Sequence, residues 1–518
     1  MDNSFLLKYK RTFGQNRYEL TVLFIYSLLL LFFCSEMSPL YPINTWCDVN
    51  IYFNVGKAMF NGRTLYAEAF DHKGPIIFFI YGLGYLISNT SFFGMFIIQL
   101  IAWFIMVSAI YFSSKLFINK QLSLIAAFIF PLFLFKYTDH GGSAEEFVLV
   151  MESVSLYFFL KYFKDVNNNY ANPKYMLVHG LTSSIAFFIK LNLIMFWFFP
   201  LLGIFICILK NRKWANLIQN LSYYILGFAI ITIPICIYFY LNDALLEAYN
   251  VYFVTNSKYA SVPQSASEII SMILNRIYLF CRGDLLGAFV ILTGIFYFPY
   301  KYIQNKVGKA SFVLCGISVF LIVSVTRSFF GYYNLPFYIF SALGWINILG
   351  YIQKYISFDI SRKATTFLCI IFILLSATQK NFFKVGGEAF FSKKGSGLVF
   401  EFTPEISKVK DAQLLNLGFG EANAIFTYCD IKPKITYFMT PNMPHELNPK
   451  LRDEQTSYIQ QKEVDFVILT NATMNYDYFR ELPALNQNYE LIDTYVDTDA
   501  YLKKINQFYT YYLYKKID

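Results

Sequence analysis

The sequence has 518 residues, of which 56% are hydrophobic, 20% are aromatic and 15% are charged, and its formal net charge is +9. A soluble globular protein carries about 25% charged residues, so this composition is typical of a polytopic membrane protein and excludes an ordinary soluble enzyme. The basic residues are scattered between apolar runs and the eight cysteines form no CxxC motif, so we expect no nucleic-acid partner, no zinc site and no disulfide framework.

The first apolar segment covers about 20–33 and follows four basic residues, Lys8, Lys10, Arg11 and Arg17. This pattern resembles a signal peptide, but no small-residue cleavage site follows it, so we interpret it as an uncleaved signal anchor. Lys and Arg accumulate on the cytoplasmic side of short loops. We therefore expect the N-terminus in the cytoplasm and the first helix running outward.

The segment 75–89 is apolar and uncharged but has only 15 residues. As a helix it would extend roughly 22 Å, whereas the hydrocarbon core of a bilayer is about 30 Å thick. We interpret it as an interfacial or re-entrant helix, because counting it as a span would also place the basic residues of the following loop outside.

Ten later apolar runs then alternate in direction and, with the first helix, predict about eleven spans. They cover approximately 91–114, 121–137, 147–163, 175–189, 191–209, 219–241, 285–300, 311–326, 335–352 and 364–379. An odd number of spans places the C-terminal tail on the outer face, while most basic residues of the short loops stay inside.

The tail, 381–518, differs in composition from the transmembrane domain at 1–380 and predicts a small α/β domain. Its strand-like runs are 414–417, 465–469, 489–494 and 508–514, and a helix-compatible stretch lies around 449–462. A linker precedes it and contains Gly386, Gly387, Gly395 and Gly397.

The first outer loop, about 36–90, is long and rich in aromatic residues, which favours a functional loop over a disordered one. Asp48 follows the first helix closely, where its carboxylate could face a cavity at the membrane surface. A helix cap or a solvated charge is the plainer interpretation of a single Asp. The loop continues into FDHKGP, which contains Asp71, His72 and Lys73.

The second outer loop, about 138–146, places three carboxylates within eight residues: Asp139, Glu145 and Glu146. These charges repel one another and need a cation, a metal ion or a bound amine unless water screens them. Alternatively, Ser143 and the two glutamates cap the helix that begins there and complement its dipole. The two interpretations are compatible.

Three basic residues on the predicted outer side form another group: Lys73, Lys190 and Arg327. A cation near membrane depth is costly unless it snorkels to the surface or meets an anion. A lipid phosphate at the outer headgroup level would be such an anion.

The order of these motifs resembles the GT-C superfamily of membrane glycosyltransferases that use polyprenyl-phosphate sugars. The nearest branch contains the protein O-mannosyltransferases and the lipid A aminoarabinose transferase. The shared features are an Asp soon after helix one, a basic element before a short hydrophobic helix (DHKGP), an acidic second loop (DHGGSAEE) and a late aromatic motif (FFGYYNLPF). They cover the layout of about residues 1–350.

The resemblance implies that Asp48 is the catalytic base and that Lys73, beside His72, meets the phosphate of the donor. The other residues that we assign to the site are the second-loop acidic candidates Asp139, Glu145 and Glu146, the phosphate-binding candidates Lys190 and Arg327, and the pocket candidates Asp71, Tyr332 and Tyr333. A divalent cation, Mg²⁺ or Mn²⁺, is a possible cofactor, with Asp48, Glu145 and Glu146 as its candidate ligands.

The expected function is inverting transfer of a sugar from a polyprenyl-phosphate donor to a glycan, lipid or protein acceptor, at the outer face of a bacterial inner membrane and among membrane lipids. Two alternatives stay open. A lipid-linked saccharide flippase or transporter would also use interfacial cations, although it should place charged helices at mid-membrane. A polysaccharide polymerase or ligase would use a large later loop, and 242–284 is long enough.

Overall fold

A computed structural model places most of the chain in two compact units. It describes residues 16–138, 140–165, 170–260, 265–326, 330–355, 361–379, 397–418, 420–440, 443, 445–497 and 508–517. The first unit comprises Met1–Ser35, Gln99–Ile233 and Pro263–Phe383, and the second comprises Glu36–Ile98, Pro234–Val262 and Lys384–Asp518. The predicted domain boundary at 380/381 lies outside the described residues.

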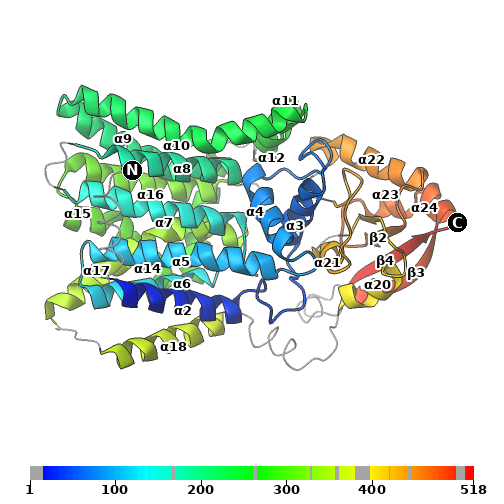
Figure 1. The fold of residues 1–518 in the computed structure, drawn as a ribbon, viewed down its shortest axis with the longest axis horizontal. Helices are drawn as coiled ribbons and strands as arrows, with labels where there is room; N and C mark the ends of the chain where they lie inside the picture. Colours follow the sequence, from blue (N-terminus) through cyan, green and yellow to red (C-terminus); the bar gives the residue numbers. More distant parts are fainter. Residues whose placement is uncertain are drawn as a thin grey trace. The chain divides into compact units, whose positions relative to one another are not determined.

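Long helices form the first unit (Figure 1). In chain order they are α2 (Arg17–Cys34), α5 (Phe93–Lys115), α6 (Lys120–Leu134), α7 (Ala144–Phe163), α8 (Pro173–Ile189), η1 with α9 (Leu191–Ile194 and Met195–Lys210), α10 (Trp214–Leu241), α13 (Ala266–Gly283), α14 with η3 and α15 (Leu285–Leu292, Thr293–Tyr297 and Phe298–Tyr302), α16 (Lys306–Ser324), η4 with α17 (Gly331–Tyr338 and Ile339–Tyr355) and α18 (Arg362–Gln379). The boundary between the units falls within α5 and α10.

Each of the eleven predicted spans lies on a helix, but the number of spans is not confirmed. Among the described residues, seven helical runs are long and apolar enough to cross a membrane: Arg17–Cys34, Phe93–Lys115, Leu191–Lys210, Trp214–Leu241, Leu285–Tyr302, Lys306–Ser324 and Gly331–Tyr355. Helices α6, α7, α8 and α18 are not among these seven runs. A run has to be both long enough and apolar enough to cross a membrane, and each of these helices falls short in length or in apolar character. The protein is a multi-pass membrane protein.

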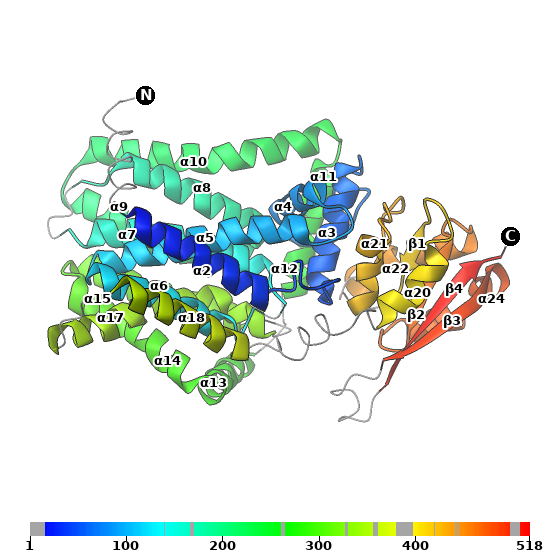
Figure 2. The same cartoon turned by 60° about the horizontal axis from the view of Figure 1, so that its bottom comes forward.

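Small residues allow close approach within the helical unit, as is common where helices pack in lipid. A Cβ atom added to Gly180 of α8 would lie 2.2 Å from the backbone oxygen of Tyr224 in α10. Elsewhere α16 packs on α9, and α18 packs against α2 and α6. Figure 2 shows α18 along α2 from a second direction.

The second unit contains the first outer loop and the C-terminal domain. Its helices are α3 (Cys47–Phe60), α4 (Pro75–Ile87), α11 (Leu245–Tyr249), η2 (Asn250–Thr255), α12 (Asn256–Ala260), α20 (Leu398–Ile406), η5 (Gly420–Asn423), α21 (Ala424–Tyr428), η6 (His445–Leu447), α22 (Pro449–Gln460), α23 (Tyr476–Arg480) and α24 (Pro483–Asn488). Helix α4 begins with Pro at its first turn and has 13 residues, which agrees with the short helix predicted at 75–89.

One four-stranded sheet organises the C-terminal domain, in the order β1-β2-β4-β3. The strands are β1 (Leu414–Asn416), β2 (Phe466–Thr470), β3 (Tyr489–Asp497) and β4 (Tyr509–Lys516). β1 pairs with β2 in parallel, whereas β4 is antiparallel to both of its neighbours. Every residue of β2 is buried, as expected for a central apolar strand. The four strands and the helix predicted around 449–462 are confirmed; of the predicted linker glycines, only Gly397 is among the described residues.

Helices α3 and α4 pack so closely that Gly56 has no room for a side chain. A Cβ atom there would lie 2.6 Å from the backbone nitrogen of Gly82 and 2.6 Å from the backbone oxygen of Phe78. Backbone atoms cannot move aside as the end of a flexible side chain can, so this contact fixes the distance between the two helices.

We expect Gly56→Ala to lower the free energy of unfolding by about 1–3 kcal/mol, because the new methyl group overpacks the α3–α4 contact. Thermal melts of the detergent-solubilised protein would measure this. Gly283→Ala is the matched control, since nothing lies within 4 Å of a Cβ atom at Gly283. Equal melting temperatures for the two variants would contradict the close packing of α3 on α4.

Candidate functional site

Asp48 lies in the first turn of α3, where it is partly exposed. A carboxylate at this position is favoured by the helix dipole, so the simple capping interpretation holds in part. Asp48 also accepts a hydrogen bond on Oδ2 from the hydroxyl of Tyr52, over 3.4 Å. Tyr52 stands four positions later on the same helix, which brings the two side chains to the same face.

Lys73 approaches the same tyrosine. Its Nζ atom lies 6.0 Å from the centroid of the Tyr52 ring, within the range of a cation–π interaction. The Tyr52 ring is fully buried, and Phe78 and Tyr81 of α4 pack against it. Tyr52 therefore contacts both the carboxylate of Asp48 and the ammonium group of Lys73.

The backbone around Lys73 is held from two directions. Asp71 accepts the Lys73 N–H on Oδ1 over 2.9 Å, and the hydroxyl of Tyr66 donates to the Lys73 carbonyl oxygen over 2.6 Å. His72 is buried, with Nδ1 3.8 Å from Asp71 Oδ2 and its ring 5.1 Å from that of Tyr259. Asp71 and His72 thus shape the loop in which Lys73 stands.

Next to Asp48, Cys47 is a neutral thiol. Burial raises the pKa of Cys47 to about 12, and the negative charges of Asp48 and Asp71 contribute in the same direction. The thiol is therefore not a candidate nucleophile, since the thiolate is the reactive form. Its pKa also indicates that both carboxylates lie near one point at the start of α3.

In the first unit, Glu146 has a structural role. Its Oε1 accepts hydrogen bonds from the side chains of Gln99 (2.7 Å) and Trp103 (2.5 Å), and its Oε2 accepts the Gly142 N–H over 2.8 Å. The Ser143 hydroxyl accepts the Glu146 N–H, which makes Ser143 the cap of α7. Neutral donors therefore hydrogen-bond to this buried carboxylate. The cap at Ser143 agrees with the capping interpretation.

Glu145 obtains its counter-charge from Lys190. The side chain of Glu145 is 1% exposed, and its Oε1 forms an ion pair with Lys190 Nζ. The same Nζ atom lies 3.8 Å from the centroid of the Tyr333 ring. Lys190 follows the last residue of α8 as its C-cap, and Tyr333 belongs to η4. The role of Lys190 toward a donor phosphate stays a prediction, and its observed partner is Glu145.

The remaining sequence candidates are less informative. Tyr332 is buried and stacks on Phe330, with ring centroids 5.7 Å apart. Asp139 and Arg327 lie outside the described residues, so their predicted roles stay predictions.

The described part of the chain contains no group of three or more His, Cys, Asp and Glu side chains arranged to hold a metal ion. The divalent cation predicted at Asp48, Glu145 and Glu146 stays a prediction.

Sequence reasoning missed two residues of the second unit that the structure connects to the candidate base. Tyr52 could have been found from its spacing to Asp48 once a helix was assumed in the loop. Lys57 is fully buried in α3 and forms an ion pair with Asp430, 373 positions away. No local pattern predicts a partner at such a separation.

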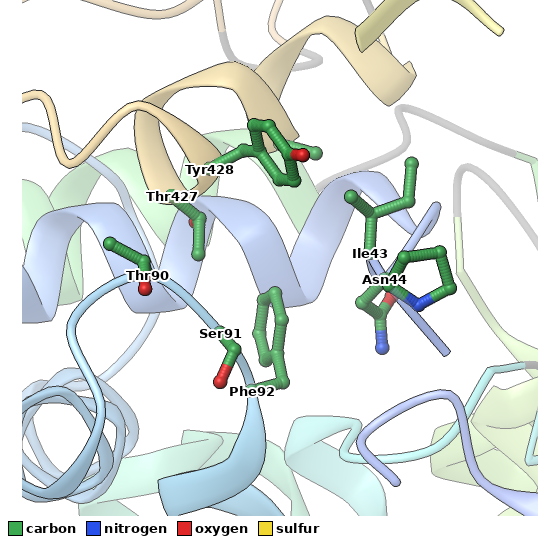
Figure 3. A pocket seen from close by; sticks show the side chains of 9 residues that line it. Ile43, Asn44, Thr90, Ser91, Phe92, Thr427 and Tyr428 are labelled. Atoms are coloured by element: carbon green, nitrogen blue, oxygen red, sulfur yellow. The ribbon is translucent and has the colours of Figure 1, made fainter. Parts of the chain in front are cut away.

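A small, partly open pocket, with room for little more than a water molecule, also lies in the second unit (Figure 3). It is lined by Pro42, Ile43, Asn44, Thr90, Ser91, Phe92, Ala424, Thr427 and Tyr428. Figure 3 shows Thr427 and Tyr428 of α21 across from Ser91 and Phe92. The cavity is a gap between the first outer loop and the C-terminal domain, and it contains none of the predicted site residues.

Residues 72–238 match the family described as dolichyl-phosphate-mannose-protein mannosyltransferase. The match begins at His72, so it includes Lys73, the second outer loop and Lys190, but not Asp48. No curated protein matches the chain.

Among solved structures, the crystal structure of ArnT from Cupriavidus metallidurans bound to undecaprenyl phosphate matches with a TM-score of 0.58 and 13% identity, over 96% of this chain and 98% of that chain. The apo form of the same ArnT gives 0.59 and 12%, over 97% and 98%. The chain has the fold of ArnT. The oligosaccharyltransferase of Archaeoglobus fulgidus in the apo form gives 0.47 and 13%, over 92% and 73%.

These findings confirm the resemblance to the GT-C membrane glycosyltransferases and the predicted fold class, a helical membrane domain with a small C-terminal α/β domain. The ArnT-like fold covers nearly the whole chain, whereas the family model matches residues 72–238, from the end of the first outer loop to within α10. The roles of single residues rest on the geometry described above.

We expect Lys190→Met to destabilise the ArnT-like fold by about 3 kcal/mol or more, because Glu145 would stay buried without a counter-charge. The double variant Lys190→Met/Glu145→Gln should recover most of that loss. Thermal melts at pH 7 would measure both.

Lys408→Met is the matched control, since Lys408 is 64% exposed in its ion pair with Glu405 and should contribute only about 0–1 kcal/mol. If Lys190→Met melted like this control, the Lys190–Glu145 pair would not be the charge compensation that the second loop requires.

Proposed function

We propose that this protein is an integral-membrane glycosyltransferase that moves a sugar from a polyprenyl-phosphate-linked donor to an acceptor, with inversion at the anomeric carbon. The class of the reaction follows from the matched mannosyltransferase family and from the fold shared with ArnT, which was crystallised with undecaprenyl phosphate. The observation that carries the assignment of residues is the placement of Asp48 and Lys73 around the Tyr52 ring.

The proposed reaction is a single displacement. The Asp48 carboxylate takes the proton of an acceptor hydroxyl as the hydroxyl oxygen bonds to the anomeric carbon. The bond between that carbon and the phosphate oxygen breaks, and the polyprenyl phosphate leaves with the electron pair. Lys73 neutralises the charge that develops on the phosphate, which makes it a better leaving group.

We place the site on the outer face of the membrane, in a bacterial inner membrane with the N-terminus in the cytoplasm. The predicted topology supports this orientation, since it assigns most basic residues of the short loops to the side opposite the first outer loop. A donor with a long prenyl chain cannot leave the bilayer, so its phosphate has to be met at the interface. The acceptor is a glycan, a lipid or a protein.

One observation favours the alternative of a lipid-linked saccharide flippase. Glu152 lies in the middle of α7, is fully buried, and neither of its carboxylate oxygens has a hydrogen-bond partner in the described structure. Ionisable residues inside a membrane often mark a transport path. The match to a mannosyltransferase family nevertheless favours sugar transfer over transport.

We expect Asp48→Asn to reduce sugar transfer by about 10²–10⁴-fold, which is what a general base usually contributes. The assay uses purified protein in liposomes with a labelled polyprenyl-phosphate sugar and a mixture of candidate acceptors. Asp477→Asn, an exposed carboxylate in α23, is the matched control and should leave the rate unchanged.

An undiminished rate in Asp48→Asn would remove Asp48 from the mechanism. Movement of the labelled donor across the bilayer without cleavage of its phosphate bond would instead support the flippase and contradict the proposed transferase.

A further inference from the structure

A polar face of α3 docks on the C-terminal domain. Asn54 donates through Nδ2 to the Asn423 carbonyl oxygen over 2.9 Å, and the Thr427 hydroxyl donates to Asn54 Oδ1 over 3.2 Å. The Asn423 side chain also donates to the sulfur of Cys47 over 3.3 Å. Figures 1 and 2 both show α21 beside α3, within the second unit. The start of the candidate site is thus covered by a segment 369–376 positions later in the chain.

Lys57 is the charged residue of this face. Its side chain is fully buried, and Nζ donates to the Phe426 carbonyl oxygen over 2.9 Å and lies 3.2 Å from Asp430 Oδ1. The other oxygen of Asp430 accepts a hydrogen bond from Asn89 over 2.8 Å. Removing one partner from a buried ion pair leaves an uncompensated charge, so the pair strongly favours the docked arrangement.

The Lys57 side chain is protonated at neutral pH. Burial lowers its pKa to about 8, while the carboxylate of Asp430 and the neighbouring Cys429 raise it and Lys432 lowers it. The rings of Phe53 and Tyr85 flank the ammonium group at 5.7 and 5.6 Å. The contact with Asp430 is therefore ionic at pH 7.

Different faces of α3 contact different parts of the second unit. Successive residues of a helix are rotated by about 100°, so Cys47, Asn54 and Lys57 fall within an arc of about 80°. Asp48 lies about 100° around the axis from Cys47, and Gly56 meets α4 on a third side. A rotation of α3 about its own axis would move Asp48 and would break the contacts of Lys57 at the same time.

We propose that the C-terminal domain holds Asp48 in its reactive orientation by docking on α3 through Lys57 and Asp430. Lys57 is a positioning residue, because its contacts are to Phe426 and Asp430. This inference rests on the proposed function, in which Asp48 is the base. In this inference the C-terminal domain takes part in the reaction by positioning Asp48, and it supplies no reacting group.

The test compares Lys57→Met and Asp430→Asn with wild type in the liposome transfer assay and in site-resolved alkylation of Cys47. We expect kcat to fall at least tenfold in both variants while KM for the donor stays within about twofold, because Lys73 is unchanged. Cys47 is buried, so its alkylation by a maleimide should be slow in wild type and at least tenfold faster in the variants.

Lys408→Met serves as the control, because it removes a lysine from an exposed ion pair of the same domain. It should change neither kcat nor the alkylation of Cys47. Asp430→Asn keeps the test decisive if Lys57→Met fails to fold, since Asp430 is 29% exposed and the change keeps the size of the side chain.

A wild-type kcat in a variant whose Cys47 reacts quickly would show that Asp48 works without the docked domain, and the proposal would fall. Unchanged alkylation in both variants would show that Lys57 and Asp430 do not hold the domain, with the same consequence. If wild type itself transferred no sugar, the proposed function would fail, and the alkylation of Cys47 would then decide the docking alone.

Discussion

The arrangement depends on one 14-residue helix, α3, being held on two sides so that its third side can present Asp48. Gly56 brings the backbone of α3 against that of α4, and the ion pair of the buried Lys57 with Asp430 fixes a face about 100° away around the helix axis. Both contacts tolerate little change. The α3–α4 contact at Gly56 has no room for a methyl group, and loss of either partner of the Lys57–Asp430 pair would cost roughly several kcal/mol of stability. The short helix α3 thereby acquires a defined rotation, which the proposed role of Asp48 as a base requires.

The charges of the two outer loops are compensated in different ways. In the second loop, Glu145 pairs with Lys190 and Glu146 accepts hydrogen bonds from neutral donors, so these carboxylates stabilise the start of α7. In the first loop, Asp48 accepts a hydrogen bond from the hydroxyl of Tyr52, and Lys73 Nζ lies 6.0 Å from the centroid of the same ring. In the proposed reaction these two groups would act on different partners, Asp48 on an acceptor hydroxyl and Lys73 on a departing phosphate.

Much of the fold could be predicted because its signals are local. The strands of the tail are short apolar runs between polar stretches, and the segment at 75–89 is too short for a span; both predictions agree with the structure. The number of spans could not be fixed, because α7 combines length with several charged residues that packing has buried. Helix α3 was not predicted, because the loop lacks a clear apolar period. Without a helix there, the four-residue spacing between Asp48 and Tyr52 could not be recognised as a contact on one helix face. The pairs Lys57–Asp430 and Lys190–Glu145 join residues distant in sequence, and no composition or period encodes such partners.

The most direct test of the central claim is a cryo-electron microscopy structure of the full chain in lipid nanodiscs with a polyprenyl phosphate. The account predicts that the phosphate density lies within hydrogen-bond distance of Lys73 Nζ, on the side of the Tyr52 ring from which a sugar would reach Asp48. A phosphate held elsewhere, with Lys73 unchanged against Tyr52 and Asp48 facing away from it, would contradict the shared site and the mechanism built on it.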